Sequence, residues 1–244
     1  MNTTFKKIYL AILLVLISLN FSACSGIFSD DDTAVVQSLT LAQQYNSAVT
    51  DAMMKTDVYN NLIAIYSTNE NLVWDSSHTR IAVLSVMKPG RESTYSPAGK
   101  EINIQWKSFV TVAPQLKSAV KNSTYSNLNL RVEEFLGLPD AGYNYCVELW
   151  VKPSSLFRPS PDPEIDDTVA ETTYRPGTSQ EYINWLNQQI YESYYSGSKF
   201  PFTRLGYTYD WGGSTKFGMS EFVIQTGSTV EVKLPATAFA EYFK

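Results

Sequence analysis

Hydrophobic residues in the first half of the chain recur first at helical and then at strand spacing. From Ala34 onward apolar residues return about every 3.6 positions, which predicts a helix that ends before the turn-prone residues 68–71. Short apolar or alternating runs predict strands at 81–87 and within 102–112. The residues 88–100 between them are rich in Pro, Gly and Ser, so we expect a long loop there.

The second half of the chain continues this mixture. Residues 130–136 predict a short helix ended by the Gly and Pro that follow, and the alternation across 146–151 predicts a strand with two different faces. Residues 153–178 hold five prolines and no apolar periodicity, so they predict a long loop, and loops of this length are usually functional or disordered.

A helix and two more strands follow the long loop. Thr178 and Glu181 form a capping-box pattern for a helix over 179–195. Residues 222–224 and 230–234 predict two strands joined through a Gly-Ser turn. Helices and strands occur without regular strand–helix alternation, so we expect an α+β fold: a single domain with a mixed or antiparallel sheet and flanking helices.

Composition narrows the class of protein. The 244 residues are 44% hydrophobic and 14% aromatic, which is enough to build a core and excludes a disordered chain. The formal net charge is −5 and basic residues do not cluster, so no nucleic-acid partner is expected. Two cysteines and one histidine make neither a disulfide framework nor a histidine-rich metal site, and no cofactor is expected.

The first 23 residues have the pattern of a signal peptide. Lys6 and Lys7 precede the apolar stretch Ile8–Leu19. As a helix this stretch would rise roughly 18 Å, well short of the ~30 Å hydrocarbon core of a bilayer, so a permanent span is not expected. Small residues then lead to Cys24.

The run Phe21-Ser22-Ala23-Cys24 resembles the lipobox of bacterial lipoproteins, although Phe21 replaces the usual leucine. The resemblance implies cleavage before Cys24 and attachment of diacylglyceride and fatty acyl groups such as palmitate to that residue. Ser25 resembles the sorting pattern for outer-membrane delivery. Residues 29–32, Ser-Asp-Asp-Asp, resemble the acidic surface-export tag of some Bacteroidetes lipoproteins, and they equally fit a plain solvated linker.

These features divide the chain into a signal peptide at 1–23, an acidic flexible tether at 24–33 and a globular domain at 34–244. Loss of Lys6 and Lys7 with the signal peptide changes the formal net charge to −7. We therefore expect an exported protein, lipid-anchored to the cell envelope at the outer membrane or the cell surface.

The proline-rich loop carries a weak signal for calcium. Its carboxylates could join backbone carbonyls as oxygen ligands, but the Asp-x-Asp-x-Asp-Gly spacing is absent. A solvated loop in which Arg158 pairs with a carboxylate is the competing interpretation. The calcium candidates are Asp162, Glu164, Asp166 and Asp167.

Residues 191–222 are dense in aromatic side chains. Exposed rings there would suit a sugar or a protein partner, with Tyr207, Tyr209 and Trp211 as candidate ligand-binding residues, whereas buried rings would simply form core. Gly212 and Gly213 would let a ligand approach the backbone. Residues 136–139, the proline-rich loop and residues 205–212 together resemble an uncharacterised family of exported bacterial proteins, which implies no activity.

Catalytic motifs are largely missing. No Gly-x-Ser-x-Gly elbow, phosphate loop or dinucleotide fingerprint occurs, and Cys146 fits a small buried hydrophobe. A carboxylate-dependent glycan hydrolase needs only two acidic residues in a cleft, with Glu148, Asp210 and Glu221 as candidates. We expect a binding or structural module that presents an aromatic surface to an envelope protein or glycan, with an envelope glycan hydrolase as the alternative.

Overall fold

The computed structural model describes residues 38–244, and residues 1–37 are outside this description. The predicted signal peptide, the tether, Cys24 and the expected helix start at Ala34 all lie in that undescribed part. Leu39–Lys244 forms one compact unit. Within it, no helix is both long and apolar enough to cross a membrane.

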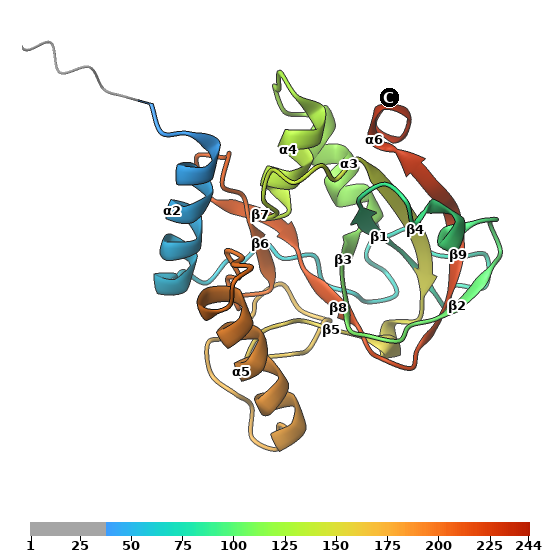
Figure 1. Ribbon diagram of the computed structural model, residues 1–244. Coiled ribbons are helices and arrows are strands. Elements are labelled where there is room, and N and C mark those ends of the chain that lie inside the picture. The colour runs from blue at the N-terminus through green and yellow to red at the C-terminus, as the bar shows by residue number, and fades with distance from the viewer. Residues whose placement is uncertain (1–37) are drawn as a thin grey trace, which may run out of the picture. The chain divides into compact units, whose positions relative to one another are not determined.

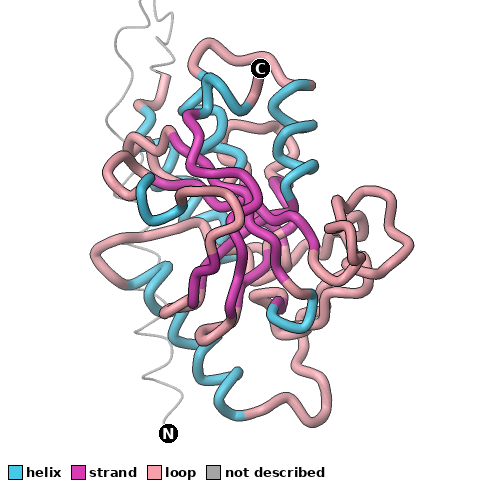
Figure 2. Tube along the Cα trace, turned by 90° about the vertical axis from the view of Figure 1, so that its right-hand side faces the viewer, coloured by secondary structure: helices cyan, strands magenta, loops and turns pink. Residues whose placement is uncertain are grey.

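A seven-stranded sheet forms the centre of the domain (Figures 1 and 2). The strand order is β2-β9-β4-β1-β3-β8-β5, and every neighbouring pair is antiparallel. The α+β fold with an antiparallel sheet is thus confirmed. The sheet strands are β1 (Ile81–Met87), β2 (Glu101–Asn103), β3 (Ser108–Val112), β4 (Tyr145–Val151), β5 (Leu156–Phe157), β8 (Phe222–Ile224) and β9 (Thr229–Ala238). A separate pair is formed by β6 (Tyr207–Tyr209) and β7 (Phe217–Ser220).

The two faces of the sheet bury different clusters, as the period-two pattern of the strands requires. Ile81 and Val83 of β1 pack into one cluster with Val147, Leu149 and Val151 of β4. The alternate β1 residues Ala82 and Leu84 pack on the other face with Cys146. The short helices cover that second face: α3 (Ala113–Lys121), α4 (Leu128–Phe135) and α6 (Phe239–Tyr242), which lie close together in Figure 1.

Two longer helices, α2 (Leu41–Met54) and α5 (Gln180–Tyr195), pack in a third cluster on the side of the domain away from β2 and β9 (Figure 1). Thr40 and Gln43 form a capping box at the start of α2. At its other end, the Arg204 guanidinium donates hydrogen bonds to the carbonyls of Met53 and Lys55. This side chain satisfies carbonyls that the helix end leaves free, and α2 ends well before residue 68.

Two predictions about the second half of the chain need correction. Ser179 rather than Thr178 caps α5, because its hydroxyl accepts the Tyr182 amide at 3.2 Å. Strands β8 and β9 exist as expected but do not pair with each other: β8 lies between β3 and β5, and β9 lies between β2 and β4. The turn at Gly227 instead pairs with the residue after β2, since its amide donates to the Ile104 carbonyl.

Two one-turn 3₁₀ helices, η1 (Glu92–Tyr95) and η2 (Pro153–Ser155), complete the elements. The loop expected at 153–178 is shorter in the structure, because its first residues form η2 and β5. It begins at residue 158, and its first part is buried. The fully buried Arg158 holds this part by donating to the carbonyls of Glu164, Ile63 and Asp167. Arg158 therefore bonds to backbone oxygens rather than to a carboxylate.

Candidate functional site

A cavity of about 610 Å³ lies beside β1, β3 and the end of α5. Other parts of its wall come from residues 136–138, 200–203 and 207–209 and from Glu221, so segments far apart in the sequence contribute to it. Most of the wall is apolar or aromatic, and the volume is in the range of small-molecule binding sites. Its apolar lining includes Leu84, Phe109, Val110, Leu136, Phe200 and Phe202.

The mouth of the cavity is marked by exposed apolar side chains. Phe109 is 38% exposed and Phe200 is 37% exposed, although both line the cavity. The Phe109 ring packs edge-to-face against Phe202, with the ring centroids 6.2 Å apart. Exposed Glu192 from α5 adds a carboxylate at the same opening. The cavity is thus an apolar space with access to solvent.

Glu221 places a carboxyl group in this cavity. It connects β7 to β8, and its backbone amide donates to the Gly206 carbonyl at 2.9 Å. Its side chain lies deep in the protein and is accessible only partly, toward the cavity. Within residues 38–244 the carboxyl has neither a hydrogen-bond donor nor a cationic partner. Burial therefore raises its pKa from 4.5 to about 8.

The candidate aromatic residues are buried rather than exposed. Tyr207, Tyr209 and Trp211 are 0%, 2% and 4% exposed, so they do not form an open aromatic face. Tyr207 and Tyr209 nevertheless line the cavity. Trp211 lies outside the cavity wall, and its indole N–H donates to the Leu138 carbonyl at 2.9 Å. Two of the three candidates thus border the cavity, but their hydroxyls are engaged within the domain: Tyr207 donates to the Asp57 carbonyl and Tyr209 to the Asp51 carboxylate.

The structure does not gather the three hydrolase candidates in one site. Both Glu148 oxygens are engaged, one by the Tyr242 hydroxyl at 2.6 Å and the other by the Lys233 ammonium. Asp210 receives two hydrogen bonds of 2.7 Å from the Arg131 guanidinium. Of the three, only Glu221 lines the cavity.

The space beside Gly212 and Gly213 is filled by the carboxylates of Glu134 and Asp210 rather than left open for a ligand. A Cβ at Gly212 would collide with the Glu134 carboxylate, and one at Gly213 would lie 2.5 Å from an Asp210 oxygen. The Gly213 amide donates to Asp210 at 2.8 Å. The expectation that a ligand approaches this backbone is therefore wrong, because the chain's own side chains occupy the position.

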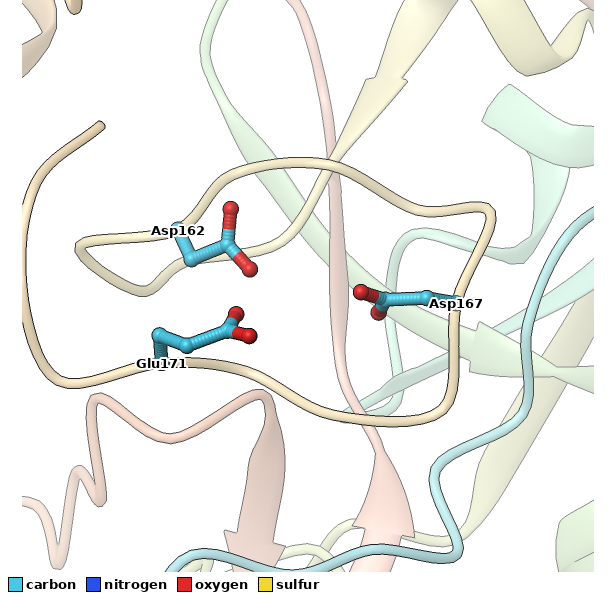
Figure 3. Close-up of side chains that lie close together, drawn as sticks. All are labelled: Asp162, Asp167 and Glu171. Atoms are coloured by element: carbon cyan, nitrogen blue, oxygen red, sulfur yellow. The ribbon is translucent and has the colours of Figure 1, made fainter. Parts of the chain in front are cut away.

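A second candidate group of residues lies in the proline-rich loop (Figure 3). Asp162, Asp167 and Glu171 place carboxylate oxygens within 4.8 Å of one another. Figure 3 shows the Asp162 and Glu171 carboxyl groups side by side, with Asp167 pointing toward them. Asp162 is fully buried, and burial together with the Glu171 carboxylate raises its pKa to about 7. In the described part of the chain, these three form the one group of three or more metal-ligating side chains that could hold a metal ion.

The loop also supplies positive charge of its own. The Arg175 guanidinium lies 2.8 Å from an Asp162 oxygen and also pairs with Glu164. Glu164 and the exposed Asp166 do not belong to the three-carboxylate group, whereas Glu171, which sequence analysis missed, does. Since calcium takes six to eight oxygen ligands, three carboxylates beside an arginine supply only part of a site.

The remaining reactive side chains are engaged or inert. Cys146 is buried, and burial raises its pKa to about 12, so the thiolate is disfavoured at neutral pH. The His78 ring stacks on Trp74, and its Nε2 lies 2.8 Å from the Ser67 carbonyl. Cys24, the expected lipidation site, is outside the described residues.

No protein-family model matches the chain, and no curated protein or solved structure matches it either.

Proposed function

We propose that this chain is a lipid-anchored protein of the bacterial cell envelope whose domain binds a small apolar ligand. The cavity beside Glu221 is the observation that carries the ligand part of the proposal. It combines an apolar wall, an opening to solvent and one buried polar group, which is the usual make-up of a small-molecule site. The lipobox-like run before Cys24 supports the anchor.

Binding in an interior cavity fits the chemistry of the wall. Filling the space would remove apolar surface from water, which contributes about 25 cal/mol for each Å² buried. A membrane anchor would hold the open cavity near a source of apolar molecules. Lipid-anchored proteins also meet partners on the same surface at raised effective concentration, so modest affinity is sufficient.

The hydrolase alternative has less support. A two-carboxylate mechanism needs both acids in one cleft. Glu192 is the other carboxylate of the cavity wall, but it is exposed and accepts hydrogen bonds from Gln188 and Gln189. A buried acid facing an apolar wall fits the binding of an apolar ligand better than the cleavage of a hydrated glycan.

A fluorescence titration tests the proposal. The full chain, produced with Cys24→Ser so that no acyl group competes, is titrated with the apolar dye N-phenyl-naphthylamine. Ser85 lines the cavity, so Ser85→Trp should fill part of it and weaken binding about tenfold or more. The matched control is Ser154→Trp in η2, where the residue is exposed and away from the cavity wall. Equal binding by both variants would exclude the cavity as the site.

The anchor is tested separately. Wild-type protein expressed in a Gram-negative host should incorporate radiolabelled palmitate and fractionate with membranes, and Cys24→Ala should abolish both. Unchanged labelling of the Cys24→Ala variant would refute lipidation at this residue.

A further inference from the structure

The charged groups of the cavity wall have one sign. Glu221 and Glu192 are its two carboxylates, and within the described chain no lysine, arginine or histidine lines it. The nearby Arg204 guanidinium is turned toward the carbonyls of Met53 and Lys55. Lys88 does not line the cavity, although its ammonium lies 5.2 Å from the centroid of the Tyr143 ring, which does. The wall itself therefore offers a ligand carboxyl groups but no cationic group.

The polar and aromatic parts of the wall suit a cation. Glu221 offers two carboxylate oxygens that no donor within residues 38–244 engages. Phe109 and Phe200 add partly exposed aromatic rings to the same wall, whereas the Tyr207 ring is packed against Tyr59 and Phe217. Ring faces attract ammonium groups, and the attraction is stronger where water is excluded. A carboxylate with surrounding rings in an apolar space is a common arrangement for binding an organic cation.

We infer that the ligand is an apolar amine, bound as its ammonium ion by the Glu221 carboxylate with its hydrocarbon part in the apolar cavity. This inference rests on the proposed function and specifies its ligand class. Once Glu221 is ionised, above about pH 8, an anionic amphiphile would place a second negative charge beside it. A neutral ligand would gain only the apolar contacts and an uncharged hydrogen bond, which is roughly half as strong as a charged one.

Binding of an ammonium ion is coupled to proton release. In the empty cavity the Glu221 carboxyl holds its proton below about pH 8. When the ammonium N–H groups donate to the carboxylate, that proton leaves to solvent, so one proton is released for each ligand bound. The tyrosines of the wall stay neutral in this range, because burial raises the pKa of Tyr143, Tyr207 and Tyr209. Glu192 is the other ionisable group of the wall, and it faces solvent.

Isothermal titration calorimetry with three matched probes tests the inference. The full-length Cys24→Ser protein is titrated with decylamine, decanol and decanoate at pH 6, 7 and 8, in buffers with different ionisation enthalpies. We expect decylamine to bind about ten- to a hundredfold more tightly than decanol at pH 8. Its affinity should rise nearly tenfold from pH 6 to pH 7 and less steeply from pH 7 to pH 8, where Glu221 starts to ionise, with one proton released at pH 6.

Variants assign the effect to Glu221. Glu221→Gln should lower decylamine affinity at pH 8 to that of decanol and abolish proton release, while decanol binding changes little. Glu101→Gln is the matched control, because Glu101 is exposed on the edge strand β2. Glu192→Gln, at the mouth, should keep the proton release that Glu221→Gln abolishes.

The outcomes separate this inference from the proposed function. Equal affinity for decylamine and decanol, or decylamine binding that Glu221→Gln leaves intact, would overturn the amine assignment while the apolar site stands. Absence of binding by all three probes would overturn both.

Discussion

Replacing Glu221 by glutamine should change how the stability of the domain depends on pH. The folded state holds the Glu221 proton up to about pH 8, whereas an unfolded glutamate releases it near 4.5. Between these values the native state binds more protons than the unfolded state, so stability falls as the pH rises. Each tenfold difference in proton affinity is worth about 1.4 kcal/mol, which makes the total loss about 5 kcal/mol. Because Glu221 faces a cavity that admits water, this value is an upper limit.

The assay is urea denaturation of wild type and Glu221→Gln at pH 5 and pH 9. Other carboxyl groups with shifted pKa values, such as Asp162, titrate in both proteins and cancel in the difference. We expect the wild type to lose several kcal/mol more than the variant between the two pH values. Glutamine is nearly isosteric and carries no proton that titrates, so the free energy of unfolding of the variant should rise relative to that of wild type between pH 5 and pH 9. Parallel pH profiles for the two proteins would refute the assignment of a buried, unpartnered acid at this position.

Three further predictions concern the structure around the sites. Arg158→Met should destabilise the domain by about 3 kcal/mol or more in urea denaturation, because the half-buried carbonyls of residues 63, 164 and 167 would lose their donor. Arg158→Lys should recover only part of this loss, and stability equal to that of wild type would contradict the role of the guanidinium. Gly218→Ala should lower the melting temperature, because a Cβ there would lie 2.5 Å from the backbone oxygens of Phe135 and Thr208. The control Gly197→Ala, at a position with open space, should leave it nearly unchanged. Similar melting temperatures for the two variants would refute the close packing at Gly218. Arg131→Met should leave Asp210 without its two guanidinium hydrogen bonds and lower the free energy of unfolding by roughly 3 kcal/mol in thermal unfolding. The double variant Arg131→Met/Asp210→Asn should restore part of this loss. A double variant no more stable than the single one would contradict the pairing.

Local pattern was sufficient to predict much of the fold. The run Ile81–Met87 is a strand with the predicted bounds, and the alternation across 146–151 separates the two faces of β4. These predictions hold because each strand buries side chains that its own sequence supplies. The partners of β8 and β9 lie elsewhere in the chain, so their closeness in sequence led to a hairpin prediction that was wrong.

The candidate site was less accessible to sequence analysis. The sequence named Glu221 for its charge and Tyr207 and Tyr209 for their rings, but not the cavity that they share. That cavity requires β1, β3, the end of α5 and residues 136–138 to come together, and no periodicity within one segment reports such an arrangement. Glu171 was missed for the same reason: it meets Asp162 only because the intervening loop folds back around Arg158.

The most direct test is a crystal structure of the protein with decylamine bound. We expect the hydrocarbon chain in the cavity, between Leu84, Phe109 and Phe202, with the amine nitrogen about 2.7–2.9 Å from a Glu221 carboxylate oxygen. An empty cavity at saturating decylamine, or an amine bound elsewhere while Glu221 stays without a partner, would contradict this expectation.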